Sequence, residues 1–160
     1  MIVSWFFVIL WASVIFIMSS MDTNESNYKS KHTISNITNK VLDVSNDLGL
    51  ANKYPSNDKI NLVTEKLNYP LRKIAHASEY FILTFLLIIA LKNSRIDGLK
   101  IIVFALILCF LYACFDEYHQ TFVYGRTGQF SDALIDTLGG IICCIIYSFV
   151  IKNKFLKKHV

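Results

Sequence analysis

The sequence predicts an all-α protein, a polytopic membrane helical bundle of about four transmembrane helices with an amphipathic helix in an outer loop. Two observations predict this fold class. First, 54% of the 160 residues are hydrophobic and only 18% are charged, whereas about one quarter of a typical soluble domain is charged. Second, most charged residues gather between long apolar runs. This composition argues against a disordered, fibrous or nucleic-acid-binding protein, so we expect no nucleic acid as a partner.

Four apolar runs can each cross a bilayer, which takes roughly 17–25 mostly apolar residues. The third run reaches a comfortable length only if its helix continues into the polar residues after Phe115. We expect a single domain of residues 1–160. Its membrane helices are placed at about residues 2–19, 73–91, 99–118 and 132–151, with an extracytoplasmic loop at 20–72.

The first run could instead be a cleaved signal peptide. However, no Lys or Arg precedes its apolar core, and no clear small-x-small cleavage site follows it. The core also exceeds the roughly 7–15 residues that are usual for a signal peptide. We therefore expect an uncleaved first membrane helix.

Positive residues in the short connections set the expected orientation, because cytoplasmic loops are enriched in Lys and Arg. The connection between the second and third helices contains Lys92, Arg95 and Lys100, and the carboxyl-terminal tail contains four lysines and no acidic residue. We expect both segments on the cytoplasmic side. The protein is then a multi-pass protein of the cell membrane with both termini in the cytoplasm.

The outer loop contains two stretches in which apolar residues recur every three or four positions, the pattern of a helix with one apolar face. The first face consists of Ile34, Ile37, Val41, Val44 and Leu48, and the second of Ile60, Val63 and Leu67. Gly49 and Pro70 are expected to end these helices. Such a face can lie in the membrane interface or pack on the chain's own bundle, and the sequence leaves both open.

Polar residues enter the apolar helices near their outer ends. They form three stripes at helical spacing: Arg72, His76 and Glu79; Asp116, His119 and Gln120; and Asp132 and Asp136 before Gly139 and Gly140. Burying one carboxylate in hydrocarbon costs at least ~2.5–3.5 kcal/mol, so we expect the acidic residues to converge on one another and on nearby bases. The cluster is then either an outward-facing cavity or a salt-bridge network that only holds the helices in register.

Three segments resemble the VanZ-like family, and together they cover roughly residues 70–150. They read Arg72-Lys-Ile-Ala-His-Ala-Ser-Glu-Tyr80, Asp116-Glu-Tyr-His-Gln-Thr-Phe-Val-Tyr-Gly-Arg126 and Asp132-Ala-Leu-Ile-Asp136-Thr-Leu-Gly139. The resemblance implies a bacterial cell-envelope membrane protein. The namesake of the family accompanies glycopeptide-resistance genes in Gram-positive bacteria and lowers sensitivity to teicoplanin. The resemblance assigns no catalytic role to any residue.

We hypothesise that these motif residues bind a membrane lipid or a lipid-linked envelope component. The arginines suit this role, because a guanidinium offers a planar fork to phosphate or carboxylate. The candidate binding residues are Arg72, Lys73, His76, Glu79, Tyr80, Asp116, Glu117, His119, Gln120, Arg126, Asp132 and Asp136. The sequence does not predict an oligomeric state.

Two alternatives stay open. The first is an intramembrane enzyme acting on such a lipid, with His76, Glu79, Asp116 and His119 as candidate acid–base residues. No HExxH, GxSxG or Walker motif supports it. A divalent metal is conceivable here, because hard cations favour carboxylate oxygens. Its ligands would be His119, Asp116, Glu117, Glu79 and Asp132, but the sequence assigns neither a metal nor a cofactor. The second is a small transporter or proton relay, although the polar residues stop in the outer half of the membrane, which favours a cavity over a pore.

Overall fold

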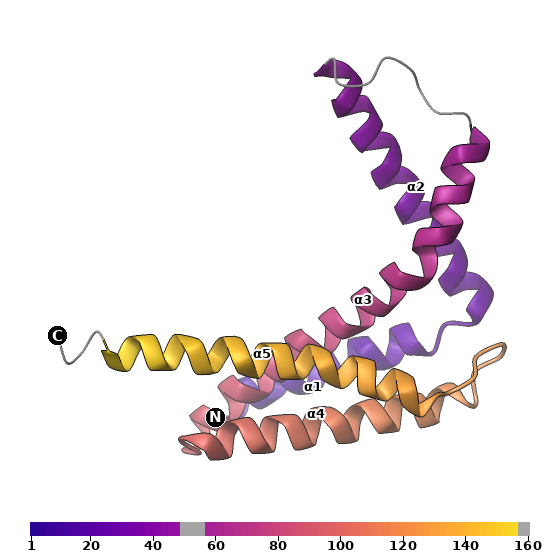
Figure 1. The fold of residues 1–160 in the computed structure, drawn as a ribbon. Helices are drawn as coiled ribbons and strands as arrows, with labels where there is room; N and C mark the ends of the chain where they lie inside the picture. Colours follow the sequence, from indigo (N-terminus) through magenta and orange to yellow (C-terminus); the bar gives the residue numbers. More distant parts are fainter. Residues whose placement is uncertain (49–56, 157–160) are drawn as a thin grey trace. The chain divides into compact units, whose positions relative to one another are not determined.

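The computed structural model describes residues 1–48 and 57–156, and over these residues it consists of five α-helices without a strand (Figure 1). In chain order they are α1 (Ile2–Ser19), α2 (Thr23–Asp47), α3 (Asn57–Asn93), α4 (Leu99–Gln120) and α5 (Phe130–Leu156). The all-α class is therefore confirmed. Gly49 and the tail lysines at 157 and 158 lie outside the described residues.

Four of these helices are long and apolar enough to cross a membrane. The candidate spans are Ile2–Ser19, Ile60–Asn93, Leu99–Gln120 and Phe130–Ile151. This confirms the polytopic membrane bundle with four membrane helices. α2 is the amphipathic helix of the connection between the first two spans, and it begins eleven residues before Ile34, the first residue of the predicted apolar face.

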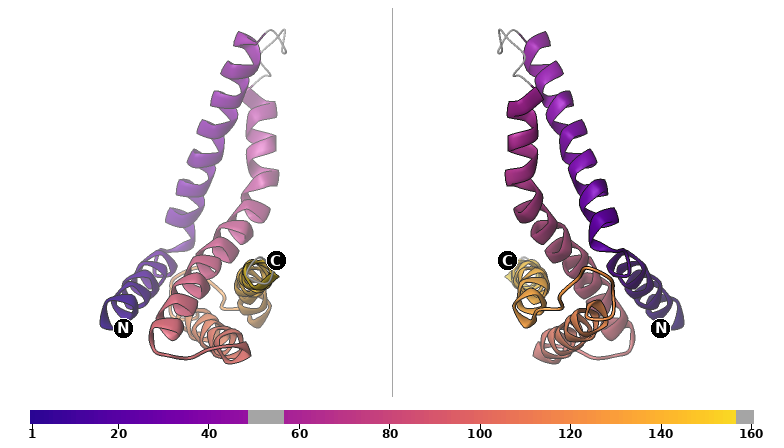
Figure 2. Two further views of the ribbon diagram at one scale, coloured as in Figure 1. Left: turned by 90° about the vertical axis from the view of Figure 1, so that its left-hand side faces the viewer. Right: turned by 90° about the vertical axis from the view of Figure 1, so that its right-hand side faces the viewer.

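The described chain forms two compact units. Met1–Met21 and the residues from Ala75 onward make up the first, which contains α1, the second part of α3, α4 and α5. We call it the four-helix unit. Asp22–Ile74 make up the second, in which α2 and the first part of α3 form an antiparallel pair (Figure 2). We call it the hairpin unit. The single domain expected over residues 1–160 stays a prediction.

Two adjacent glycines allow α5 to pack closely inside the four-helix unit. A Cβ atom on Gly139 would overlap the backbone carbonyl oxygen of Ala77 in α3. A Cβ atom on Gly140 would lie 2.7 Å from the Thr84 hydroxyl and 2.8 Å from the Cys109 sulfur. Small residues let membrane helices approach in this way. The glycine pair therefore determines how near the first turns of α5 come to α3 and α4.

Polar bonds attach α1 to its neighbours in the four-helix unit. The Trp5 indole donates to the Ser94 hydroxyl at 3.0 Å, and the Trp11 indole donates to the backbone carbonyl of Glu79 at 3.0 Å. The Tyr112 hydroxyl in α4 donates to the Ala12 carbonyl. Each bond satisfies a polar group that hydrocarbon could not satisfy. α1 is thus a packed member of the bundle.

The expectation that a helix ends at Pro70 was wrong. Pro70 lies inside α3, which continues without a break from the hairpin unit to Asn93. A proline removes one backbone hydrogen bond and costs about 3 kcal/mol in a helix interior. Contacts on both sides of the proline offset that cost, because Asn68 and Arg72 both donate to the side-chain oxygen of Asn27 in α2, at 3.3 and 2.8 Å.

Most of the predicted apolar face of α2 is not packed within the described chain. Ile34 is buried, as is Thr64 of α3 in the same unit. The other four residues of that face, from Ile37 to Leu48, are 56–66% exposed. The periodicity therefore predicted the helix correctly, although only one residue of the face is buried.

Candidate functional site

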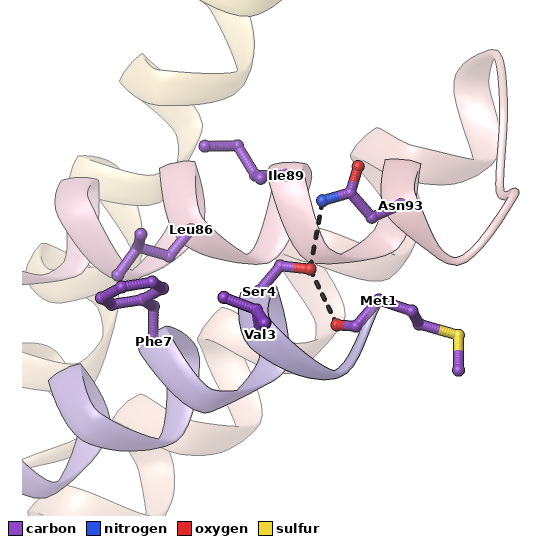
Figure 3. Close-up of a pocket in the computed structure, with 7 residues that line it drawn as sticks. All are labelled: Met1, Val3, Ser4, Phe7, Leu86, Ile89 and Asn93. Carbon is purple, nitrogen blue, oxygen red and sulfur yellow. Dashed lines mark hydrogen bonds between the residues drawn. The ribbon is translucent and has the colours of Figure 1, made fainter.

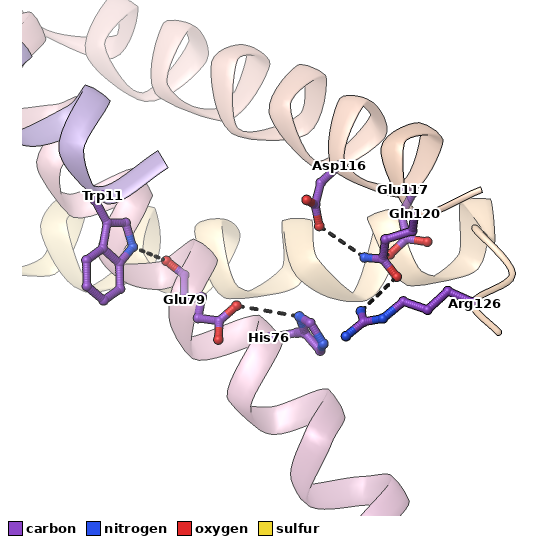
Figure 4. Close-up of polar contacts among 7 residues, drawn as sticks. All are labelled: Trp11, His76, Glu79, Asp116, Glu117, Gln120 and Arg126. Carbon is purple, nitrogen blue, oxygen red and sulfur yellow. Dashed lines mark hydrogen bonds and ion pairs between the residues drawn. The ribbon is translucent and has the colours of Figure 1, made fainter. Parts of the chain in front are cut away.

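Polar side chains from three helices and one connection meet at one end of the four-helix unit, and Figure 4 shows all of them except Asp136. This is the end at which α1 and α4 finish and α5 begins. We call the group the polar end cluster. It consists of His76 and Glu79 from α3, Asp116, Glu117 and Gln120 from α4, Arg126 from the α4–α5 connection, and Asp136 from α5.

Three carboxylates form the centre of this cluster. One oxygen from each of Asp116, Glu117 and Asp136 lies within 4.8 Å of the other two. The residues are only 0%, 6% and 2% exposed. Asp116 and Glu117 are consecutive on α4, and Asp136 belongs to α5, which packs closely on α4 where Gly140 meets Cys109. A set of converging carboxylate oxygens is the donor type that hard divalent cations prefer.

Gln120 connects two of these carboxylates to the arginine. Its side-chain nitrogen donates to Asp116 Oδ2 at 3.1 Å and to Glu117 Oε1 at 3.2 Å. Its side-chain oxygen accepts from Arg126 Nη1 at 3.1 Å. Arg126 also donates from Nε to the Met21 carbonyl at 3.0 Å. A single orientation of the Gln120 amide therefore makes all three bonds. These bonds fix the positions of the two carboxylates and the guanidinium relative to one another.

The α4–α5 connection contributes a backbone group that the sequence pattern could not reveal. The backbone N–H of Gln129 donates to Glu117 Oε2 at 2.9 Å. Gly128 makes this approach possible, because a Cβ atom there would overlap the carbonyl oxygen of Glu117 and lie 2.7 Å from the Thr121 methyl group. The only sequence signal for this contact was a glycine in a short connection before a helix.

His76 and Glu79 form a pair on α3. The distance between His76 Nδ1 and Glu79 Oε2 is 3.5 Å, and both side chains are largely buried. The histidine is also close enough to Asp116 and Asp136 to interact with them electrostatically. His119 lies beside α1, with its ring centroid 4.2 Å from that of Phe16.

Several buried polar atoms in this region make no hydrogen bond to any described residue. They are Tyr80 Oη, Asp116 Oδ1, His119 Nδ1 and Ser19 Oγ. An unmade hydrogen bond on a buried polar group costs about 1–3 kcal/mol. Buried polar groups usually have partners, so each of these atoms is a candidate contact for a polar ligand.

Three further candidates are not members of the cluster as defined above. Arg72 and Lys73 belong to the hairpin unit, where Arg72 bonds to Asn27 and the Lys73 ammonium lies 5.3 Å from the centre of the Tyr69 ring. Asp132 is half-buried in the first turn of α5, where a negative charge is stabilised by the helix dipole, and it is close enough to Glu117 to interact with it electrostatically.

Two hollows open on the four-helix unit. A hollow of about 180 Å³ lies next to the cluster and is lined by Cys114, Glu117, Tyr118, Thr121, Gly128, Phe130 and Ala133. A cleft of about 280 Å³ lies at the opposite end, between α1 and α3 (Figure 3). Its side chains are mostly apolar, apart from a hydrogen bond of 3.1 Å between Asn93 and Ser4. Only the first hollow is lined by an ionisable residue of the cluster.

Comparison with known proteins gave one match. A family model described as VanZ/LLP1 matches residues 4–152. No curated protein and no solved structure matches the chain. The matched range contains the whole polar end cluster.

Proposed function

Because this chain belongs to the VanZ/LLP1 family, we propose that it is a multi-pass protein of the bacterial cell membrane whose polar end cluster binds an envelope or lipid-linked component. The observation that carries the proposal is the convergence of buried carboxylates, Gln120 and Arg126 at one end of the four-helix unit. In this proposal both termini are cytoplasmic and the cluster faces outward.

The distribution of charge along α4 supports this orientation. Lys100 stands in its first turn and Asp116 in its last turns. A helix rises about 1.5 Å per residue, so these residues lie roughly 24 Å apart, close to the thickness of the hydrocarbon core. The end that carries Lys92, Arg95 and Lys100 belongs in the cytoplasm by the positive-inside rule. The polar end cluster then lies at the outer surface.

Arg126 suits an anionic group of the ligand, and the carboxylates of the cluster suit its hydroxyl or amide groups. Arg126 is half-buried and held by Gln120 and the Met21 carbonyl, so its guanidinium is oriented before any ligand arrives. The hollow of about 180 Å³ is smaller than the ~300–1,000 Å³ typical of drug-sized ligands. Beside Glu117 it has room for a sugar hydroxyl or a short peptide group, while the acyl or prenyl chain stays in the membrane.

The proposed consequence in the cell is reduced sensitivity to teicoplanin, which the family membership supports. The test is expression in a susceptible Gram-positive host, with teicoplanin sensitivity measured for wild type and for Arg126→Ala, His76→Ala, Glu79→Ala and Asp132→Ala. Arg95→Ala is the matched control, because it makes the same change in the exposed α3–α4 connection. Immunoblots of membranes establish that every variant is inserted at the wild-type level.

We expect wild type and Arg95→Ala to raise the inhibitory concentration and Arg126→Ala to lose most of that increase. Inserted cluster variants that keep full activity would contradict the assignment of the site. No effect of wild type would contradict the resistance role. Binding is then measured directly by native mass spectrometry of the purified protein with a polyprenyl diphosphate as the probe. We expect an adduct that Arg126→Ala weakens about tenfold, which corresponds to ~1.4 kcal/mol.

A further inference from the structure

The three central carboxylates have the spacing of ligands that share one ion. Calcium holds its oxygen ligands at about 2.3–2.6 Å, so oxygens on opposite sides of one ion are up to roughly 4.6–5.2 Å apart. The oxygens of Asp116, Glu117 and Asp136 all lie within 4.8 Å of one another. Three donors this close can converge on a single cation of this size with only small adjustments of their side chains.

Unsatisfied polar atoms in the same place are a second, independent observation. Tyr80 is completely buried, yet its hydroxyl has no hydrogen-bond partner among the described residues. It lies close enough to Asp116 and Asp136 to interact with both electrostatically. Asp116 Oδ1 likewise has no hydrogen-bond partner among the described residues. Buried polar groups normally have partners, so these atoms indicate a place built to take a polar ligand.

The surrounding residues orient the carboxylates as a second layer does around a metal. Gln120 holds one oxygen of Asp116 and one of Glu117, and the Gln129 N–H holds the other oxygen of Glu117. The neighbouring His76 is engaged by Glu79. Glu117 also lines the hollow of about 180 Å³, which gives an ion and its water molecules a path to the cluster.

From these observations we propose that Asp116, Glu117 and Asp136 bind one hard divalent cation of the calcium or manganese class. One carboxylate oxygen from each residue contacts the ion. A water molecule on the ion donates a hydrogen bond to the Tyr80 hydroxyl, and other waters complete the shell through the hollow. The sequence alone assigned no metal, and Asp136 was not among the residues that it suggested as possible ligands. The proposal goes beyond the proposed function and does not require that an envelope component binds.

The test uses the full-length protein purified in detergent and treated with a chelator. Mn²⁺ is the probe, and its binding is followed by the loss of the electron paramagnetic resonance signal of the free ion. We expect about one Mn²⁺ per chain, displaced by Ca²⁺, and a thermal unfolding midpoint that rises with either ion. Mg²⁺ should compete more weakly, because its shorter bonds of about 2.1 Å allow opposite oxygens only roughly 4.2 Å apart.

Asp136→Asn keeps the shape of the side chain and removes its charge, so we expect the affinity for Mn²⁺ to fall tenfold or more. Asp97→Asn is the matched control, since it makes the same change in the exposed α3–α4 connection, and it should bind as wild type does. Glu117→Gln replaces Asp136→Asn if circular dichroism shows that the latter is unfolded. Folded wild type that binds no Mn²⁺ at millimolar concentration would overturn the proposal, and so would wild-type affinity in both cluster variants. Teicoplanin sensitivity is not part of this readout, so the two proposals fail separately.

Discussion

The four-helix unit and the hairpin unit contain the same kinds of charged residue but use them differently. In the hairpin unit Lys31 and Glu65 join α2 to α3 at 3.1 Å, and both side chains are about half exposed. In the four-helix unit Asp116, Glu117 and Asp136 are almost completely buried. An exposed ion pair contributes about 0–1 kcal/mol, whereas each buried charge costs several kcal/mol unless it is well partnered. The buried set is therefore too costly to be incidental, while the exposed pair is ordinary surface chemistry.

We expect the largest loss of stability from a substitution at Gly139, where α5 packs on α3. Gly139→Val places side-chain atoms where the Ala77 carbonyl stands, so α5 must move away from α3 and carry Asp136 with it. Overpacking usually costs about 1–3 kcal/mol, and a clash with backbone should exceed that range. We expect loss of the folded protein, measured by thermal unfolding in detergent and by membrane level. Ser131→Ala, at an exposed position of α5, is the control and should unfold as wild type does.

An intermediate effect is expected from Gln120→Leu. The leucine keeps a similar volume but removes the amide that bonds to Asp116, Glu117 and Arg126. Leaving buried partners without bonds costs about 1–3 kcal/mol each, so the free energy of unfolding should fall by at least ~2 kcal/mol. Chemical denaturation measures it. A variant as stable as wild type would show that the amide is dispensable for holding the cluster.

The smallest effect is expected in the hairpin unit. Lys31→Ala removes the exposed pair with Glu65, and Glu65→Gln removes the same pair from the other side. Each should change the free energy of unfolding by less than about 1 kcal/mol, and the difference should vanish in high salt because exposed charges are screened. Teicoplanin sensitivity should stay at the wild-type level. A fall in the free energy of unfolding as large as that of Gln120→Leu would show that the exposed pair matters as much for stability as the buried cluster does.

Much of this fold could be predicted from local sequence alone. Four apolar runs of sufficient length predicted four membrane helices, and the period of Ile34 and its successors predicted α2. Both inferences depend on neighbours in sequence, because hydrophobic length and helical period are properties of a continuous segment. Pro70 was misjudged for the complementary reason. Proline does destabilise a helix interior, as its local chemistry predicts. The bonds that Asn68 and Arg72 make to Asn27 join α3 to another helix, so the local sequence did not reveal them.

The sequence by itself determined which residues are too polar for hydrocarbon, and hence the candidates for a site. Only the tertiary structure decided which of them meet. Asp136 joins Asp116 and Glu117 because α5 packs at Gly139 and Gly140, and Glu117 is held by a backbone N–H of the connection. Arg72 and Lys73 belong to the same sequence motif as His76 but are part of the hairpin unit. Helical spacing tells which side chains share a face, but the packing of one helix on another, set here by the absence of two Cβ atoms, tells which faces share a site.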